Sequence, residues 1–291
     1  MKPNKLLTNM KPKVAYLGPE KTFTEKAAKQ AFPDADLVPM QPIRNVVLAI
    51  ENERADYGVV PLENFYNGEV RDTLDSLTEC SRARIIQEQP LSIIHCLGAL
   101  KEHGTITIIR SKDQALEQCS RYLCEHYPSA TLIATASTAE AAKYIAEQKA
   151  LDSAAIANEQ ALLDSKLEVL AKDICPNNKT RFVILARQDT EQTGDDKTFL
   201  AIHPSIKDRP GVLYNTLGFL AGLGINLEAI QSRPDGRKGY YFYLELDGHE
   251  KDRNVALALD AIRLSLDPSS KHPKSIKILG SYPNTHWKDE N

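Results

Sequence analysis

Residues that could bind a carboxylate stand at the start of a predicted helix near position 111. Ser111 and Gln114 have the spacing of a capping box, and Lys112 lies between them at the start of the helix. A helix start offers free N–H groups and the positive end of the helix dipole, and the lysine adds a full charge. The corner is either a plain N-cap or a carboxylate site, and spacing alone leaves both interpretations open.

Three further corners between strands and helices carry polar side chains. They are the segments GPEKTF (18–23), PLENFYNGEV (61–70) and ATAST (134–138). Ligands of open α/β sheets bind at the carboxyl ends of strands, where such loops and helix starts gather. The second segment crowds Pro61, Asn64 and Gly68 into one loop, which is typical of loops that carry function. Ser137 begins another N-cap, STAEAA, with the same two interpretations as Ser111.

The elements that must position these corners alternate between strand and helix as far as residue 187. The predicted strands are KVAYLG (13–18), YGVVPLEN (57–64), TITIIRS (105–111), TLIATAS (131–137) and SAAIAN (153–158). The predicted helices are PEKTFTEKAAKQAF (19–32), RNVVLAIENE (44–53), DQALEQCSRYLCEHY (113–127), TAEAAKYIAEQ (138–148) and EQALLDSKLEVLA (159–171). Thr22 and Glu25 have capping-box spacing in the first helix. This alternation predicts an α/β fold with mainly parallel sheets.

A second region follows a polar connector. RQDTEQTGDDK (187–197) has no apolar periodicity and suits an exposed linker. The segments beyond it are predicted as strand, helix, strand, strand, helix and strand, in the order TFLAIHPS (198–205), GVLYNTLGFLAGLG (211–224), INLEAIQSRP (225–234), GYYFYLELDG (239–248), VALALDAIRLSL (255–266) and SIKILGSYP (275–283). This βαββαβ order is a ferredoxin-like pattern, and by itself it indicates no function.

Charge and hydropathy exclude several classes of protein. The 291 residues carry 36 basic and 39 acidic side chains, and no basic tract suited to a phosphate backbone occurs, so nucleic acid is not an expected partner. The first 18 residues lack the apolar stretch of a secretory signal, and no later run of 18 apolar residues would cross a membrane. We therefore expect a cytoplasmic protein without a membrane partner.

The cysteines and histidines form no metal motif. The five cysteines are Cys80, Cys96, Cys119, Cys124 and Cys175. Their number is odd, no C-x-x-C pair occurs and no histidine lies at zinc-ligand spacing, so we interpret them as reduced and mostly packing residues. His95 is interpreted as a half-buried strand residue rather than as a ligand or a base.

Taken together, several segments resemble prephenate dehydratases. The segments are YLGPEKTFTEKAA (16–28), YGVVPLENFYNGEV (57–70), STAEAA (137–142) and NNKTRFVIL (177–185), and they have the order and spacing of that family. The last one resembles the family's Thr-Arg-Phe signature. The region 197–283 is similar to the ACT domain that commonly follows, with GVLYNTL and QSRP in the places of its two phenylalanine-binding motifs.

The resemblance implies an architecture. A catalytic domain would cover 13–187, with two α/β lobes arranged as in periplasmic binding proteins. The first lobe would take about 13–90 plus 180–187 and the second about 91–175, with the active site in the cleft. A linker, 188–196, would then lead to a ferredoxin-like ACT domain at 197–283. Thr180 and Arg181 would lie where the chain crosses between the lobes.

The resemblance also implies an activity. It is the decarboxylating dehydration of prephenate to phenylpyruvate in L-phenylalanine biosynthesis, carried out by a homodimer or homotetramer and regulated by phenylalanine. Loss of carbon dioxide and water makes the ring aromatic, so the protein must supply a donor to the departing oxygen and anchors for two carboxylates. Neither a metal nor a cofactor is needed.

Site residues are assigned by matching the family's motifs. Thr180 would donate to the departing oxygen, and Arg181 would orient the loop or contact a carboxylate. The other catalytic candidates are Asn64, Ser111 and Gln118. The substrate-binding candidates are Lys21, Thr22, Lys112, Ser137, Thr138 and Phe182. The phenylalanine-binding candidates are Gly211, Val212, Leu213, Asn226, Gln231, Ser232, Arg233 and Pro234.

Several positions depart from the family's pattern. Lys21 replaces a glycine, Phe65 replaces a serine or threonine, and Gln231 replaces a glutamate; in addition, Lys112-Asp113 replaces His-Pro, and Ala136 stands where some relatives have an acidic residue. Two alternative activities therefore remain open, an arogenate dehydratase and a prephenate decarboxylase that leaves the ring non-aromatic. A small-molecule binding module is the non-enzymatic alternative, because solute-binding proteins share the two-lobed architecture.

Overall fold

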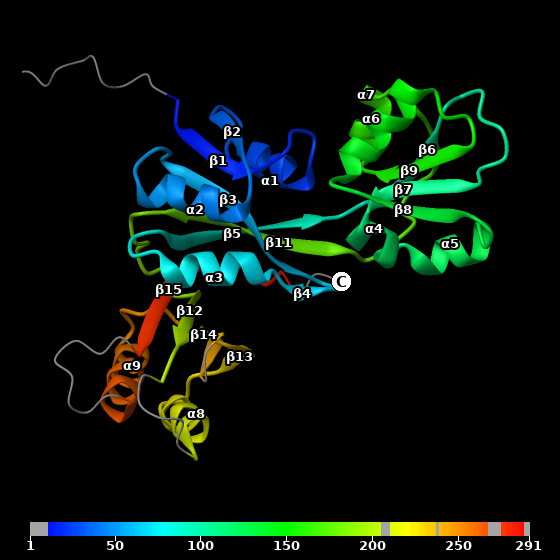
Figure 1. Cartoon of the computed structure of the whole chain (residues 1–291). Coiled ribbons are helices and arrows are strands. Elements are labelled where there is room, and N and C mark those ends of the chain that lie inside the picture. Colours follow the sequence, from blue (N-terminus) through cyan, green and yellow to red (C-terminus); the bar gives the residue numbers. More distant parts are fainter. Residues whose placement is uncertain (1–10, 205–209, 237–238, 267–274, 288–291) are drawn as a thin grey trace, which may run out of the picture. The chain divides into compact units, whose positions relative to one another are not determined.

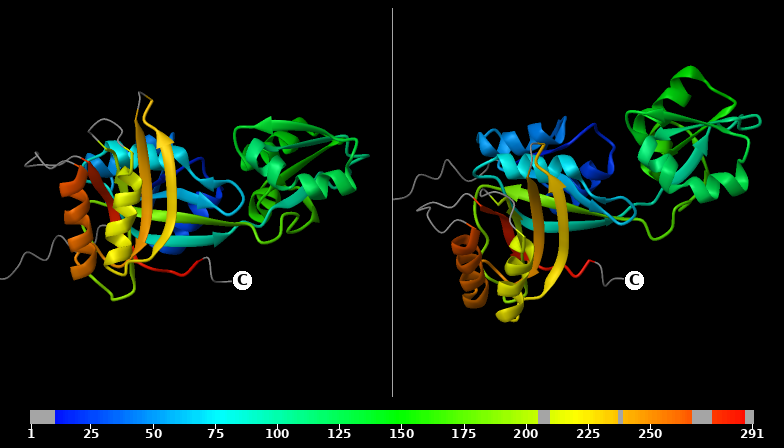
Figure 2. Two further views of the ribbon diagram at one scale, coloured as in Figure 1. Left: turned by 90° about the horizontal axis from the view of Figure 1, so that it is seen from below. Right: turned by 60° about the horizontal axis from the view of Figure 1, so that its bottom comes forward.

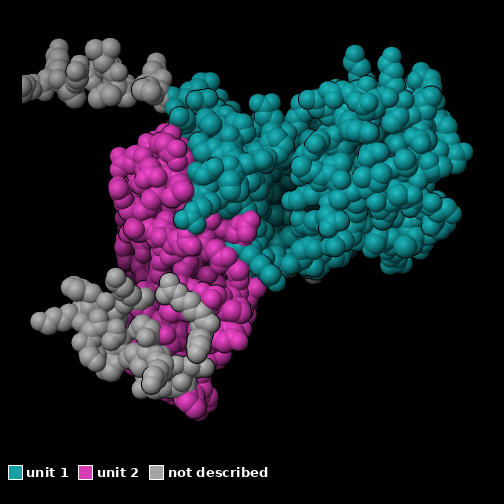
Figure 3. Space-filling view, in the orientation of Figure 1, with its two compact units in different colours: residues 1–46, 59–71, 89–182 teal, residues 47–58, 72–88, 183–291 magenta. Residues whose placement is uncertain are grey.

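The computed structural model describes residues 11–204, 210–236, 239–266 and 275–287, and the chain forms two compact units (Figure 3). Unit 1 comprises Met1–Val46, Val59–Arg71 and Gln89–Phe182. Unit 2 comprises Val47–Gly58, Asp72–Glu88 and Val183–Asn291. The predicted linker, 188–196, lies within unit 2, which also contains two N-terminal segments. The predicted domain bounds remain predictions.

The first lobe of unit 1 is built on a sheet with the strand order β11-β3-β1-β2. The strands are β1 (Lys13–Leu17), β2 (Asp36–Met40), β3 (Tyr57–Asn64) with the short β4 (Gly68–Glu69), and β11 (Lys179–Ala186); the helices are α1 (Phe23–Ala31) and α2 (Ile43–Glu51). Strands β1 and β2 are parallel, in line with the predicted α/β fold, although no strand was predicted at Asp36–Met40. Residues 47–51 of α2, 57–58 of β3 and 183–186 of β11 belong to unit 2.

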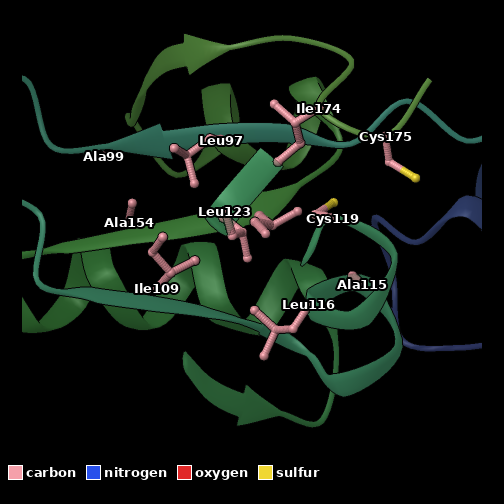
Figure 4. Packing of buried hydrophobic residues seen from close by; sticks show 11 residues of the cluster. Leu97, Ala99, Ile109, Ala115, Leu116, Cys119, Leu123, Ala154, Ile174 and Cys175 are labelled. Carbon is pink, nitrogen blue, oxygen red and sulfur yellow. The ribbon is translucent and has the colours of Figure 1, made fainter. Parts of the chain in front are cut away.

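The second lobe of unit 1 is a five-stranded sheet with the order β10-β6-β9-β7-β8 (Figure 1). Its elements are β6 (Cys96–Ala99), β7 (Ile108–Lys112), α4 (Asp113–Gln118), α5 (Ser120–His126), β8 (Thr131–Thr135), α6 (Thr138–Gln148), β9 (Ser153–Ala157), α7 (Glu159–Asp164) and β10 (Glu168–Ala171). Strand β7 runs parallel to β8 and β9, whereas β6 is antiparallel to β9 and β10. Leu97, Ile109 and Leu116 share one buried cluster with Cys119 and Cys175 (Figure 4).

Two predicted helices of this lobe are wrong in extent. The segment 113–127 forms two helices, α4 and α5, which meet at Cys119. The segment 159–171 is helical only as far as Asp164, because Lys166 adopts a left-handed conformation with φ 58° and the chain then forms β10 against β6. The apolar residues of EVLA therefore serve a strand.

The C-terminal part of unit 2 has the predicted βαββαβ order. Its elements are β12 (Asp196–Ile202), α8 (Val212–Gly222), β13 (Leu227–Pro234), β14 (Tyr240–Asp247), α9 (Arg253–Leu266) and β15 (Ile276–Pro283). The strands lie in the order β13-β14-β12-β15 with antiparallel neighbours. Helices α8 and α9 pack on one face of the sheet (Figure 2). Residues 207–209 of the KDRP segment before α8 lie outside the described residues.

Unit 2 also contains helix α3 (Arg71–Glu79) except for Arg71, and residues 84–88 of strand β5 (Arg84–Ser92). The C-terminal end of α3 is held by Lys277, whose Nζ donates to the carbonyl oxygens of Leu77 and Thr78 at 2.7 and 3.0 Å. Burial lowers the pKa of Lys277. The Asp75 carboxylate accepts two hydrogen bonds from Arg233, at 2.7 and 3.0 Å. These contacts explain why α3 packs with the C-terminal region.

Candidate active site

Three chain segments of unit 1 bring polar side chains together. Asn64 ends β3, Gln118 ends α4, and Asn178 and Thr180 flank the first residue of β11. The hairpin after Asn64 is bonded to the start of β11, because the N–H of Phe65 donates to the carbonyl oxygen of Lys179 at 2.9 Å. The site therefore depends on contacts between segments far apart in the sequence.

The amide of Asn64 has one possible orientation. Its Oδ1 accepts hydrogen bonds from the backbone N–H groups of Tyr66 and Asn67, at 3.1 and 3.2 Å. A backbone N–H can only donate, so the atom facing it must be the oxygen. The Nδ2 group of Asn64 consequently faces Thr180, and donates to its Oγ1 at 2.9 Å.

Asn64, Asn178 and Gln118 form a closed ring of amides, which we call the amide ring. Asn64 Nδ2 donates to Asn178 Oδ1 at 2.9 Å, Asn178 Nδ2 donates to Gln118 Oε1 at 2.9 Å, and Gln118 Nε2 donates to Asn64 Oδ1 at 3.0 Å. Each amide donates to the next, so the bonds polarise one another in one direction. The ring holds the three side chains in fixed positions.

The amide ring directs the hydroxyl of Thr180. Because Thr180 Oγ1 accepts the N–H of Asn64, the proton of the hydroxyl is left for another acceptor. No further hydrogen bond of this hydroxyl occurs within the part of the chain that the structure describes. Thr180 is 8% exposed, which limits competition from water. The residue can act as a positioned donor to a bound ligand.

His95 contacts the amide ring from outside, although the sequence did not place it in the site. It precedes β6, is 3% exposed, and its Nε2 lies 3.0 Å from Gln118 Oε1. Burial is the main cause of the lowered pKa of His95, so its imidazole is neutral near pH 7. Asn178 was also missed, although it stands inside the NNKTRF segment. Nothing in the sequence alone indicates that these two side chains reach Gln118.

Arg181 and Phe182 are buried in β11. The Arg181 side chain is 2% exposed, and its guanidinium pairs with the Glu63 carboxylate on β3 at 2.7 Å. Successive side chains of a strand point to opposite faces, so Arg181 and Thr180 lie on different sides of the sheet. This geometry favours the loop-orienting role for Arg181 over direct contact with a carboxylate.

Ser111 does not cap helix α4. The helix has Lys112 at its N-cap position without a side-chain capping bond, and Ser111 Oγ donates instead to the carbonyl oxygen of Ile156 at 2.7 Å. The capping-box prediction is wrong because β7 continues through Ser111 and directs its side chain into the lobe. No hydrogen bond joins Ser111 to the amide ring among the described residues. Lys112 is exposed.

The two N-caps predicted at Thr22 and Ser137 are confirmed. Thr22 accepts from the N–H of Glu25 at 3.3 Å, and Ser137 accepts from the N–H of Glu140 at 3.1 Å. Thr138 follows as the buried first residue of α6. Both caps stand beside a cleft between the lobes.

That cleft has a volume of about 1140 Å³ and is visible as a hollow within unit 1 in Figure 3. Gly18–Lys21 and Pro39–Gln41 line its first-lobe side, and Ser137 and Asp164 lie on the second. Lys21 crosses the cleft, since its Nζ pairs with the Asp164 carboxylate at 2.9 Å.

The backbone of Lys21 accounts for the glycine that the family has there. Its φ is 64°, in the left-handed region that glycine adopts without a steric cost. A side chain in this region costs roughly 1–2 kcal/mol. Phe65, the second departure, is 63% exposed and among the described aromatic rings contacts only Tyr66, in a T-shaped arrangement, so it leaves the amide ring intact.

The predicted phenylalanine-binding residues lie on two elements of unit 2. Gly211, with φ 89°, is the N-cap of α8, and Val212 and Leu213 begin the helix. Gln231, Ser232, Arg233 and Pro234 form the end of β13, and Asn226 precedes that strand and donates to Asp247 Oδ2 at 3.1 Å. The side chain of Ser232 is exposed, whereas Arg233 pairs with Asp75.

Other kinds of site find no support in the described ranges. Within them, no three His, Cys, Asp or Glu side chains gather in a way that could hold a metal ion. Across residues 11–204, 210–236, 239–266 and 275–287, no helix has both the length and the apolar composition needed to cross a membrane. Four cysteines are buried and Cys124 is exposed, in line with the packing interpretation.

Comparisons with known proteins agree with this architecture. Residues 14–190 match the prephenate dehydratase family model, and residues 204–263 match the ACT domain model. The chain is 38% identical to a bifunctional chorismate mutase/prephenate dehydratase of Aquifex aeolicus, over 94% of this chain and 74% of that protein. It is 34% identical to a prephenate dehydratase of Lactococcus lactis, over 93% of this chain and 97% of that protein.

A solved structure extends the similarity to three dimensions. The crystal structure of an Arthrobacter aurescens prephenate dehydratase in complex with L-Phe has a TM-score of 0.82 and 34% sequence identity, over 94% of this chain and 90% of that one. The similarity covers both the lobes that carry the amide ring and the C-terminal βαββαβ region. The chain therefore belongs to the prephenate dehydratase family and carries that family's C-terminal ACT domain.

Proposed function

We propose that this chain converts prephenate to phenylpyruvate in the cytoplasm and that Thr180 assists the departing hydroxyl. The observation that carries this proposal is the hydrogen bond from Asn64 Nδ2 to Thr180 Oγ1, which leaves the threonine proton for the substrate. A neutral hydroxyl is a weak acid, so Thr180 acts as a positioned hydrogen-bond donor. The buried location strengthens that bond relative to water.

The reaction balances without an added redox partner. The bond between the ring and its carboxylate breaks, carbon dioxide leaves, and the electron pair of that bond enters the ring. The ring hydroxyl departs from the opposite carbon, takes up one proton and becomes water, and the ring becomes aromatic. Because aromaticity drives the step, the protein mainly fixes the two carboxylates and stabilises charge on the departing oxygen.

We assign the anchors for the carboxylates to two lysines and two helix N-termini, of which Lys21 and Ser137 line the cleft. Lys112 is exposed and has no ion pair in the described part of the chain, so its charge is available to a ligand. Lys21 would have to exchange the Asp164 carboxylate for that of the substrate. The N-termini of α1 and α6, at Thr22 and Ser137, add the positive ends of two helix dipoles.

The first experiment identifies the product. Purified protein is incubated with prephenate at neutral pH, and the product is analysed by mass and by ultraviolet absorption. Phenylpyruvate supports the proposal, whereas a dihydro product indicates the decarboxylase. Faster conversion of arogenate than of prephenate indicates the arogenate dehydratase. A chain that binds prephenate without converting it is a binding module, and the proposal then fails.

Regulation by phenylalanine forms the second part of the proposal. The Arthrobacter aurescens relative was solved with L-Phe, and this chain has the matching C-terminal domain. We place the effector at Gly211–Leu213 and Gln231–Pro234, between ACT domains of a homodimer or homotetramer. Equilibrium sedimentation tests the assembly, and inhibition by phenylalanine tests the site. A monomer that is insensitive to phenylalanine contradicts this part alone.

A further inference from the structure

His95 is a buried titratable side chain that the proposed reaction does not use. The imidazole of His95 makes a T-shaped contact with the ring of Phe23 at a centroid distance of 5.6 Å, and the His95 carbonyl oxygen accepts the N–H of Ile174 at 3.0 Å. The imidazole and the backbone of His95 are therefore both fixed in position. Its Nε2 faces Gln118, while its Nδ1 is buried without a hydrogen-bond partner among the described residues.

The tautomer of His95 follows from the amide ring. The backbone donors at Tyr66 and Asn67 fix the oxygen of Asn64, so the group of Gln118 that faces this oxygen must be its NH₂. The Oε1 of Gln118 is then the atom that faces His95. An oxygen can only accept, so a proton must reside on Nε2 of the histidine.

The alternative tautomer would disturb the whole arrangement. With the proton on Nδ1, the lone pair of Nε2 would face the lone pairs of Gln118 Oε1. Rotation of the Gln118 amide would relieve that repulsion, but it would place Oε1 against Asn64 Oδ1 and Nε2 against Asn178 Nδ2. Two bonds of the amide ring would be lost, and only the backbone N–H groups of Tyr66 and Asn67 and the bond to Asn178 would still hold Asn64 toward Thr180.

We propose that His95 is a positioning residue, which donates its Nε2 proton to Gln118, fixes the orientation of that amide and so reinforces the hold of Gln118 on Asn64, the residue that donates to Thr180. His95 does not touch the substrate in this role. Its effect reaches the reaction only through the hydroxyl of Thr180, so the inference rests on the proposed function. Because the tautomer itself can be observed, it can be tested separately from that function.

The kinetic experiment compares two substitutions in the full chain. His95→Leu removes the donor, and we expect a kcat about tenfold lower, the effect of one hydrogen bond, with little change in KM. His95→Gln places an amide N–H near the position of Nε2, and we expect it to restore most of the lost kcat. Equal losses in the two variants, or a loss confined to KM, would overturn the proposal, because packing alone would then explain them.

A double variant tests whether His95 acts through Thr180. If it does, His95→Leu combined with Thr180→Ala is no slower than Thr180→Ala alone, since the hydroxyl that His95 orients is already absent. Losses that multiply would show that His95 acts elsewhere and would overturn the proposal. Urea unfolding of each variant separates a lower kcat from a lower fraction of folded protein.

The last measurement does not depend on catalysis. Nitrogen-15 NMR at pH 7.5 reports which ring nitrogen carries the proton, and the signal of His95 is assigned by its absence from His95→Gln. We expect a protonated Nε2 and an unprotonated Nδ1. A proton on Nδ1 alone would overturn the proposal even where His95→Leu fails to fold. If the protein does not convert prephenate but shows the expected tautomer, the proposed function fails while the arrangement of His95 stands.

Discussion

The amide ring and the predicted phenylalanine site differ in how far the chain itself completes them. In the amide ring, both polar atoms of Asn64, Gln118 and Asn178 have partners within the chain. At the predicted phenylalanine site, Gln231 Oε1 is buried without a partner in the described residues, and Arg233 is turned to Asp75. The difference indicates that the chain alone orients the hydroxyl of Thr180, the proposed donor, whereas Gln231 at the proposed phenylalanine site keeps an unused acceptor among the described residues.

Removal of the Thr180 hydroxyl should have the largest effect. We expect Thr180→Ala to lower kcat by roughly 10²-fold or more, the usual scale for a positioned acid or donor. Thr180→Ser keeps the hydroxyl and serves as the matched control. Steady-state kinetics with prephenate measure both variants. A near-normal kcat in Thr180→Ala would show that the hydroxyl oriented by the amide ring takes no part in catalysis.

Reversal of the hydrogen bond between Asn64 and Thr180 should have a somewhat smaller effect. In Asn64→Asp, a carboxylate oxygen replaces the group that donates to Thr180, so the hydroxyl proton would turn inward to that oxygen. We expect kcat to fall between about 10-fold and 100-fold.

Asn67→Asp is the control for that reversal. Asn67 Oδ1 accepts from the amide groups of Gln118 and Gln114, and an aspartate would still accept both. We expect a kcat close to that of the wild type. Similar losses in Asn64→Asp and Asn67→Asp would point to added negative charge as the cause and would contradict the directional role of Asn64.

Completion of the regulatory site should produce an intermediate effect. Gln231→Glu would supply a carboxylate to the amino group of phenylalanine, and a charge-assisted bond of this kind would tighten binding about tenfold. We expect modest inhibition of the wild type and stronger inhibition of the variant, without a change in the kcat of the unliganded enzyme. Calorimetry on the full chain measures the affinity. Gln231→Ala is the control, and tighter binding there would exclude a charge effect.

The smallest effect concerns pH and the buried histidine beside the ring. Burial lowers the pKa of His95 in the folded state, so the unfolded chain takes up its proton first as pH falls. The contribution is fully present above the unfolded pKa of about 6.5 and is lost as pH falls from there through the folded value.

Urea unfolding at pH 7.5 and 5.5 tests this dependence in the wild type and in His95→Gln. We expect the wild type to lose more unfolding free energy, by at most about 1.4 kcal/mol per pH unit, because glutamine does not titrate. Equal losses would show that His95 keeps an ordinary pKa and that the site tolerates its charge.

The sequence predicted the elements that propensity and periodicity determine. The α6 helix at Thr138–Gln148 and the strand at Tyr57–Asn64 have the predicted bounds, and the βαββαβ order of the C-terminal region is confirmed. The prediction failed in a segment whose secondary structure depends on pairing with a distant strand. The segment Glu168–Ala171 has an apolar pattern that suits a helix, yet it pairs with β6, and no local signal reveals that partner.

The site was predictable to the extent that motifs carry it. Asn64, Gln118 and Thr180 were placed by resemblance, and the structure joins them in one network. Ser111 was expected to start a helix, but its hydroxyl satisfies the carbonyl oxygen of Ile156, a residue 45 positions away. His95 illustrates the same limit, because its importance depends on the side chain it meets in space.

The distant origins of the amide ring have a consequence for folding. Its bonds join residues separated by 54, 60 and 114 positions, so none of them can form in a short peptide or in one isolated segment. Closing such loops is entropically costly and comes late, once many long-range contacts cooperate. Catalytic activity should therefore return only with the final phase of refolding, later than the helical signal, and a chain cleaved between the segments should regain activity only if its fragments reassemble.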